Sequence, residues 1–519
     1  MNRATIGTGP TTFRLMRLSL PLATLLALPL PLLGQLPFLD APVGTLRIGL
    51  HGEFAPAFRE YADGTRRDLG APISFGQDPA LLRDMSTRLG TLLGRQADPG
   101  RLGSIAADLE YQRGTGTIGL AVGVTPRITI GLDLPIVSVR TQAQLTTDAT
   151  GATVGVNPAI SGNPSSRDFV DQFGVALTQL GERIASGAFD TDPALKMAAT
   201  ALAQDGPGLQ AQLAALVTDP ATASPVLPLT DSPDGIALRA LTDDVRDELR
   251  DRFGITGFTA SLALPSTALT DGDLSALLGS PAGYNLAPTT DPPLATLGDV
   301  RVGATVRVVD VPHLRIWAQA GVRLPTATAP RVRYLRDQGT GDRQFAVDLA
   351  GTIETGRGPI GVRGTATLSR PFATDREVRL GRRDEVLLPA SRTTTLRRIP
   401  GQQFSLDVQP YLRVAPSFAL YGQLGYLRRG ATSWEAAAAS TPTSGGALGS
   451  MGTGTGATAM TAGLGLSYAH SGVNKDGIVK MPVEAGFGVV RVVSSSSGLV
   501  ADRLTTRVWF RVYKRLFTR

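Results

Sequence analysis

Arginine and acidic side chains recur at every second position of several segments, and they are the residues of this chain best suited to chemistry. Guanidinium groups bind anions, and rings of arginine favour anions in pores. The alternative is that arginines and acids pair with each other and brace a wall. Arginines outnumber acids, which slightly favours the first interpretation. The residues expected to share one inward, polar face are Arg301, Arg307, Arg315, Trp317, Arg323, Asp348, Glu354, Arg363, Asp407, Tyr411, Arg413, Glu484, Arg507 and Arg511.

Catalytic and cofactor sites are not predicted. The three histidines, His51, His313 and His470, are far apart in the sequence and show no metal-ligand spacing. There is no cysteine to act as a thiolate ligand or nucleophile. Residues 114–119 match G-x-G-x-x-G, but a strand pattern follows where a dinucleotide site requires a helix. An outer-rim hydrolase would have to use His51, and we do not expect an enzyme.

The segments that carry these residues alternate between apolar and polar side chains. In residues 301–309, Val302, Ala304, Val306 and Val308 share one face, and residues 314–324 repeat the pattern after a short turn. Alternation over about ten residues is typical of transmembrane β-strands. Strands are expected near 44–54, 104–124, 127–147, 296–309, 313–325, 343–354, 359–371, 402–413, 417–430, 456–469, 479–492 and 504–515.

The connections between these segments alternate in length. Short turns fall near 126, 311, 356 and 416, whereas 55–103, 148–295, 326–342, 372–402, 431–455 and 493–503 are long. Transmembrane barrels have short turns at one end and long loops at the other. The sequence therefore predicts an all-β transmembrane barrel of about twelve antiparallel strands, with ten or fourteen as alternatives. The slip in alternation at 114–116 predicts a bulge.

Residues 148–295 have a different pattern. Helices are expected at 167–186, 193–203, 209–217 and 235–253, the last with apolar residues at three-to-four spacing. We interpret this segment as an α-helical extracellular insertion, with a loosely ordered loop as the alternative. It separates a first barrel part, 35–147, from the remainder, 296–519.

The N-terminus resembles a secretory signal. Arg14 and Arg17 precede an apolar run at 18–33, which contains three prolines and is short for a transmembrane helix. Residues 1–34 are therefore expected to be a cleaved signal peptide. No later run has 18 apolar residues, so a mature chain that spans a membrane must do so with strands. The net charge of +7 includes three leader arginines, which leaves +4, too little to indicate nucleic acid.

Together, the leader, the tight hairpins and the aromatic terminal strand at 507–517 resemble bacterial outer-membrane β-barrel proteins of the porin or transporter type without assigned activity. Such proteins usually end in an aromatic, and here Thr518 and Arg519 follow Phe517. The resemblance implies localisation in the outer membrane, contact with its lipids and recognition by the barrel-assembly machinery. It favours a channel or transporter for small solutes, with a preference for anions. The alternative is a structural or ligand-binding surface barrel that works through 148–295.

Overall fold

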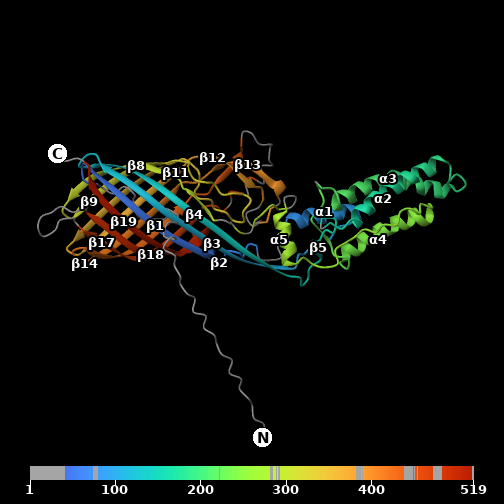
Figure 1. Ribbon diagram of the computed structural model, residues 1–519, viewed down its shortest axis with the longest axis horizontal. Helices are drawn as coiled ribbons and strands as arrows, with labels where there is room; N and C mark the ends of the chain where they lie inside the picture. The colour runs from blue at the N-terminus through green and yellow to red at the C-terminus, as the bar shows by residue number, and fades with distance from the viewer. Residues whose placement is uncertain are drawn as a thin grey trace, which may run out of the picture.

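The described residues form a barrel with a helical extension (Figure 1). The computed structural model describes residues 41–516 except 74–79, 161, 221, 281–283, 288, 290–292, 382–386, 389, 438–447, 449–450, 453 and 471–481. The predicted leader and Phe517 lie outside the described residues. The barrel strands are β1 (Thr45–Ala62), β3 (Ser104–Gly123), β4 (Ile128–Asp148), β8 (Arg301–Val311), β9 (Leu314–Arg323), β10 (Ala346–Arg357), β11 (Ile360–Pro371), β14 (Gln403–Ala415), β15 (Phe418–Arg429), β17 (Ala457–His470), β18 (Val483–Ser497) and β19 (Leu499–Arg515).

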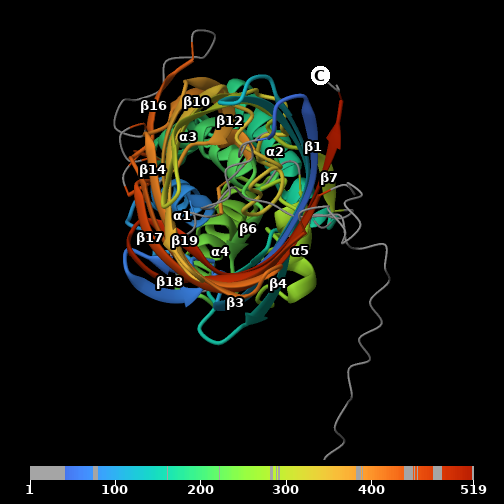
Figure 2. The same ribbon diagram turned by 90° about the vertical axis from the view of Figure 1, so that its left-hand side faces the viewer.

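These twelve strands close into one antiparallel barrel. Each pairs with the strand before and after it in the barrel, and β19 pairs with β1 from Thr45↔Arg515 to Ala62↔Leu499. Figure 2, a view along the barrel, shows the strands as a closed ring. The short strands β2 (Thr65–Asp68) and β7 (Leu294–Leu297) add to β1 and β4 at the edge of this sheet. The predicted all-β barrel of twelve strands is confirmed.

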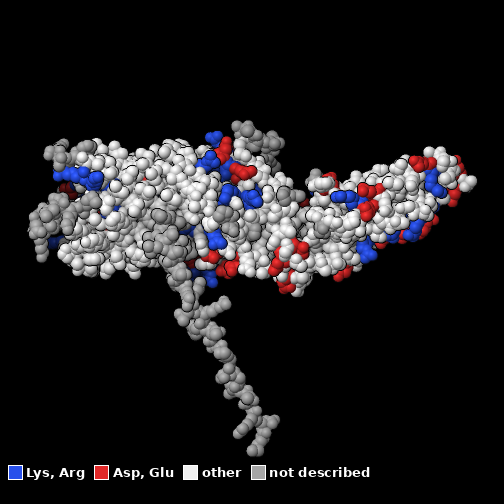
Figure 3. All heavy atoms as spheres, viewed as in Figure 1, with Lys and Arg blue, Asp and Glu red and all other residues white. Residues whose placement is uncertain are grey.

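The two faces of the barrel wall differ in polarity because successive side chains of a strand point to opposite faces. Large apolar side chains are exposed on the outside, such as Leu420 on β15 and Leu464 on β17. Buried Thr305, Thr352 and Asp407 face the inside. The space-filling view shows an almost uncharged band across the visible face of the barrel (Figure 3). Lys and Arg lie at the end near the C-terminus, and charged side chains of both signs lie on the side toward the helical unit.

The two ends of the barrel also differ. The turns between β3 and β4, β8 and β9, β10 and β11, and β14 and β15 are short, and β1 begins and β19 ends at this same end. We call it the turn end. The opposite loop end carries the long connections, as the alternation of lengths predicts. The connection between β17 and β18, at 471–481, lies outside the described residues.

Several boundaries differ from the prediction. β1 continues to Ala62 and forms a hairpin with β2, where a loop was expected from residue 55. β18 and β19 are joined at Gly498, so the expected long link at 493–503 is wrong. The added part of β18 ends in four serines, whereas the added part of β1 holds both apolar and charged residues. The strand expected at 296–309 is split into β7 and β8, and the register of β3 with β4 runs through 114–116 without a bulge. A register shift lies instead at Ala57/Arg59 of β1.

Beyond the loop end lies a helical unit whose apolar core continues into the loop end of the barrel, at residues such as Leu109 and Val139 (Figure 1). Phe169, Phe173 and Phe258 are almost fully buried, with ring centroids 5.1 to 6.3 Å apart. The helices α2 and α3 confirm the helical character predicted for this segment, but 193–203 and 209–217 form one helix that contains Pro207. The elements are α1 (Ala80–Leu93), β5 (Val154–Val156), α2 (Ser165–Ala185), α3 (Pro193–Val217), β6 (Val226–Pro228), α4 (Pro233–Asp247), the π-helical turn η2 (Glu248–Arg252) and α5 (Asp271–Gly279).

Helix α1 belongs to this unit although it comes from the β2–β3 connection. Its buried Leu82, Met85 and Leu89 are part of the same apolar core as the α2 phenylalanines, so two separate loops build the unit. Among the described residues, no helix is long and apolar enough to cross a bilayer. A second small sheet of β12 (Thr374–Arg379), β13 (Thr393–Ile399) and β16 (Ser433–Ala436), with the 3-10 turn η3 (Ala390–Arg392), extends the loop end.

Candidate functional site in the barrel lumen

Contacts between strands that are not neighbours identify the inner face of the wall. Arg507 of β19 reaches Gln423 of β15 at 3.4 Å, although β17 and β18 lie between these strands. Tyr421 and Trp509, from the same two strands, have ring centroids 5.9 Å apart. Side chains can meet in this way only on the concave side of a curved sheet. The lumen is therefore lined by the odd-numbered residues of β15 and β19 in this region and by the residues in register with them.

Most residues of the expected polar face lie on this inner side, and many are paired. Arg363 contacts Glu354 at 2.6 Å, and the Tyr411 hydroxyl donates to the same carboxylate at 3.4 Å. The other contacts are Arg323–Asp348 at 3.1 Å, Arg511–Glu484 at 3.3 Å, Arg507–Glu53 at 3.0 Å, and Gln423 donating to Asp407 at 2.6 Å. For these arginines the structure agrees with the second interpretation, in which arginines and acids pair with each other across the wall of the barrel.

The remaining expected residues are not drawn into these pairs. Arg307 bonds Asp310 and the Pro126 carbonyl at the turn end, and Arg315 lies 4.0 Å from Asp310. The Arg413 guanidinium lies 5.6 Å from the centre of the Tyr411 ring. Trp317 is buried beside these residues, and Arg301 lies within electrostatic range of Asp133 and Asp348. Arg307, Arg315 and Arg413 thus lie at the turn end of the lumen, apart from the pairs that brace the wall.

The register reveals several inner-face residues that the alternation pattern does not predict. Arg47, Glu53, Arg113 and Arg503 are largely buried in the lumen. His51, expected on the polar side of the first strand, lies on the inner face 3.7 Å from Glu53. Extending the alternation of each strand through its polar end would have found Arg113 and Arg503. That neither arginine forms a salt bridge with a carboxylate of the described residues depends on neighbouring strands, so the sequence of one strand does not predict it.

Glycines make room for aromatic rings that lie flat against the inner wall. A Cβ at Gly486 would lie 2.0 Å from the Trp509 ring, and one at Gly465 would lie 2.3 Å from the Tyr421 ring. Any side chain at these positions would displace a stiff aromatic ring. The glycines therefore determine where Tyr421 and Trp509 stand in the lumen.

The β9–β10 connection, residues 324–345, folds across the loop end, and we call it the lumen loop. Arg336 donates to the Leu69 carbonyl at 2.6 Å and contacts Glu60 at 3.0 Å. Glu60 belongs to β1, which β8, β4 and β3 separate from β9. Arg113 of β3 donates to the Thr340 carbonyl at 3.3 Å. The lumen loop thus crosses the opening and is tied to the opposite wall.

An ionic cluster ties the lumen loop to the small sheet above the barrel. Asp342 contacts Arg398 at 2.8 Å and Arg376 at 3.8 Å. Burial alone would raise the pKa of the Asp342 carboxyl, but the two guanidinium groups outweigh burial and hold this pKa below its ordinary value. Burial and the neighbouring Arg398 lower the pKa of Arg376 to about 10. The cluster is therefore ionised at neutral pH.

We predict that acid weakens this attachment of the lumen loop. Because the pKa of Asp342 is lowered in the folded protein, its contribution is complete above the ordinary carboxyl pKa of about 4 and is lost as the pH falls through the lower, folded value. Hydrogen exchange of residues 324–345 should be unchanged from pH 7 to about pH 5 after correction for the intrinsic rate. The exchange rate of these residues should rise at lower pH, as Asp342 becomes protonated. Asp342→Asn should show the faster exchange already at pH 7, which separates Asp342 from Asp299, whose pKa burial raises. Equal protection in the variant and the wild type at pH 7 would contradict the attachment.

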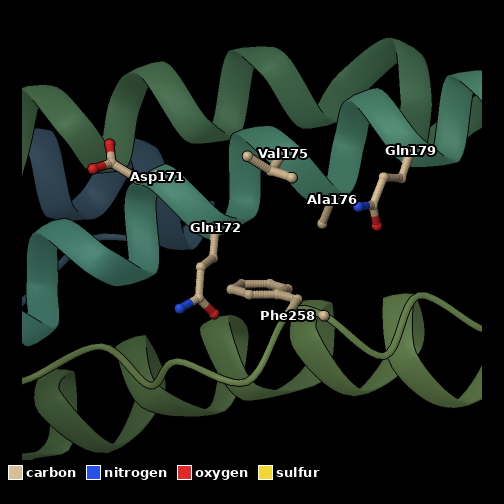
Figure 4. A pocket seen from close by; sticks show the side chains of 7 residues that line it. Asp171, Gln172, Val175, Ala176, Gln179 and Phe258 are labelled. Atoms are coloured by element: carbon tan, nitrogen blue, oxygen red, sulfur yellow. The ribbon is translucent and has the colours of Figure 1, made fainter.

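The helical unit carries a shallow cavity of about 180 Å³ (Figure 4). Phe258 forms its floor, and Gln172, Val175 and Gln179 of α2 line it. The side-chain oxygen Oε1 of Gln172 accepts hydrogen bonds from the backbone N–H groups of Thr259 and Ala260, both at 3.0 Å, and so fixes this edge of the cavity. The lining holds a single carboxylate, Asp171, and no nucleophile with a base, so the cavity offers no catalytic arrangement. In the part of the chain that the structure describes, no three His, Cys, Asp or Glu side chains are grouped to hold a metal ion.

Comparisons with known proteins give similarities of architecture. No family model matches the sequence, and no curated protein matches it. An outer-membrane channel from Pseudomonas putida F1 is similar in structure with 9% identity and a TM-score of 0.42, covering 92% of this chain and 97% of that chain. A FadL homologue of Pseudomonas aeruginosa has 8% identity and a TM-score of 0.27, with 91% and 90% covered. OmpT, an outer-membrane protein of Vibrio cholerae, has 10% identity and a TM-score of 0.22, with 92% and 99% covered.

Proposed function

We propose that this protein is a bacterial outer-membrane channel that passes small water-soluble solutes, with a preference for anions. The observation that carries the proposal is the polarity of the wall, which is apolar outside and charged inside. A soluble barrel would bury its apolar face and expose its polar one. Here Leu424 is 59% exposed and Leu464 is 74% exposed, whereas Asp407 is 2% exposed.

The height of the barrel agrees with a bilayer. The 12-residue strand β15 carries outward Phe418, Leu420 and Leu424. At a rise of ~3.3 Å per residue and a tilt of ~40°, such a strand spans roughly 30 Å. This is about the thickness of the hydrocarbon core of a membrane. In this orientation the turn end with both chain ends is periplasmic. The helical unit is then extracellular, lipids contact the apolar band, and the barrel-assembly machinery inserts the chain.

The lumen supports a narrow, charged path rather than a wide pore. Twelve strands fall between small filled barrels and the 16–18-stranded porins that leave an aqueous channel. The lumen loop crosses the loop end, and arginines such as Arg315 and Arg413 gather at the turn end. Rings of arginine favour anions over cations. The proposed preference for anions rests on these arginines, which outnumber the acidic residues of the expected inner face.

Planar-bilayer recording tests the channel and its loop together. We expect discrete conductance steps, and a reversal potential in a KCl gradient with the sign of an anion-preferring pore. Arg336→Gln should open the path further, because it unties the lumen loop while Arg67, 2.9 Å from Glu60, keeps that buried carboxylate paired. Arg59→Gln is the matched control, since its pair with Asp68 is exposed.

The outcomes separate three cases. Steps in the wild type, or silence in the wild type with steps in Arg336→Gln, support a channel that the lumen loop narrows. Steps without ion preference remove the anion part. No steps from folded, membrane-inserted wild type and Arg336→Gln would overturn the channel.

A further inference from the structure

A buried arginine in the lumen has two guanidinium nitrogens without a hydrogen-bond partner in the described part of the chain. Arg503 of β19 is 9% exposed, and its Nε and Nη1 atoms are buried without a hydrogen-bond partner. Among the described residues, no carboxylate forms a salt bridge with it. Arg507 lies four residues further along β19 on the same face, and it forms a salt bridge with Glu53 at 3.0 Å. The surroundings of Arg503 therefore differ from those of the paired lumen arginines.

A second buried guanidinium lies near the first. Arg113 of β3 is 6% exposed, and its Nε also has no hydrogen-bond partner. Arg503, Arg113 and the Tyr111 hydroxyl are within electrostatic range of one another. The strand between them, β1, presents the small side chains of Ala55 and Ala57 at this level, which leaves the space over it to the long side chains.

The space beside Arg503 is small and is lined by a further free donor. Arg503, Thr461 and Thr505 line a cavity of about 10 Å³. The Thr461 hydroxyl is buried without a hydrogen-bond partner. A cavity of this size is at the lower limit for one water-sized species, about 10–15 Å³. Val490 and Val492 also line it, so the cavity admits a single compact group that Arg503 and Thr461 can reach with their donors.

The charge at this level is unbalanced. Glu53 is the carboxylate within electrostatic range of Arg503 and Arg113, and it already contacts Arg507 and His51. A buried charge without a partner is strongly unfavourable, and protein sites resolve it with a counter-ion. Arginine cannot resolve it by losing its proton.

We propose that Arg503 and Thr461 form a binding site for one compact anionic group, a chloride ion or a carboxylate oxygen of a passing solute. The site deepens the proposed function, since it would be a station on the anion path through the lumen. Arg113, which donates to the Thr340 carbonyl of the lumen loop, adds to the positive charge near this station.

Anion-dependent unfolding tests the site without requiring conduction. The refolded protein in uncharged detergent is heated in sodium chloride, sodium acetate or sodium gluconate at equal ionic strength, and tryptophan fluorescence gives the unfolding midpoint. A ligand that binds the folded state raises this midpoint with its concentration. We expect chloride or acetate to raise it by an amount on the order of 2 °C relative to bulky gluconate. Chloride alone would identify a halide site, and acetate a carboxylate site.

Substitutions locate the effect. Arg503→Gln should abolish the anion dependence and, in gluconate, should unfold at a higher temperature than the wild type, because it removes an unbalanced buried charge. Arg59→Gln should keep the dependence. Thr461→Val keeps the charge and should raise the half-saturating anion concentration about 5-fold, as expected for one lost hydrogen bond. Thr461→Val therefore also tests the site if the Arg503→Gln variant does not fold.

Identical midpoints in the three salts, or an undiminished dependence in both Arg503→Gln and Thr461→Val, would overturn the site. If the barrel conducts but its unfolding does not depend on the anion, the anion site is wrong and the proposed channel stands. A barrel that shows the dependence without conducting removes the channel and leaves the site.

Discussion

Leu464→Arg should prevent most of the protein from inserting into lipid vesicles. Leu464 lies near the middle of β17, points outward and is 74% exposed. In water this substitution would be almost neutral, because an exposed leucine gains little from its position. At the midplane of a bilayer an outward arginine costs about 2–4 kcal/mol. The expected result is a loss of folded protein of more than tenfold.

The assay compares the fraction of heat-modifiable, protease-resistant barrel after refolding into vesicles. Val175→Arg is the matched control, because Val175 on α2 is 58% exposed but belongs to the helical unit outside the apolar band. The control should insert like the wild type. If Leu464→Arg and Val175→Arg insert equally well, the apolar band does not face lipid, and the membrane orientation falls with it.

Gly486→Val should strongly destabilise the barrel from the inside. A Cβ at this position would lie 2.0 Å from Cζ2 and 2.2 Å from Cη2 of Trp509, and the indole ring is itself in contact with Tyr421. Overpacking of a well-filled interior costs typically about 1–3 kcal/mol. We expect the upper end of this range or beyond, since a rigid ring and not a flexible chain must move.

Denaturant titration of protein in detergent measures this effect. Gly351→Val is the matched control, because Gly351 faces outward on β10 and a Cβ there meets nothing within 4 Å. The double variant Gly486→Val, Trp509→Ala should be less destabilised than the sum of the two single variants, since the clash disappears with the ring. Additive effects would show that the valine acts through something other than Trp509.

Much of the fold could be predicted because the membrane imposes a repeated pattern. All twelve strands were expected near their observed places, since each must present an apolar side chain to lipid at every second position within the apolar band. Beyond the band this requirement ends. The serine-rich end of β18, up to Ser497, is therefore not predicted. The end of β1, up to Ala62, is not predicted because a register shift at Ala57/Arg59 interrupts its alternation. Helix α1 was missed for a related reason, because its apolar side meets a partner from a different loop.

The candidate site could be predicted only in part. Alternation indicated that Arg323, Arg363 and Arg511 share a face, but their acidic partners come from other strands and depend on register. The lumen loop has no periodicity that would reveal its inward path. The isolation of Arg503 is a property of several strands together, so no local pattern could have indicated it.

The seam between β1 and β19 has a consequence for how the chain matures. The pairing Thr45↔Arg515 joins residues from opposite ends of the described chain, whereas every other barrel pairing joins residues much closer in sequence, with β4–β8 at Asp133↔Arg301 the next most distant. Contacts of large sequence separation form late and slowly, because the entropy of closing the loop must be lost first. The helical unit, built on local contacts apart from α1, can fold early. Until its final strand arrives, the barrel remains a curled sheet with two open edges, and its assembly is complete only when the first strand meets the last.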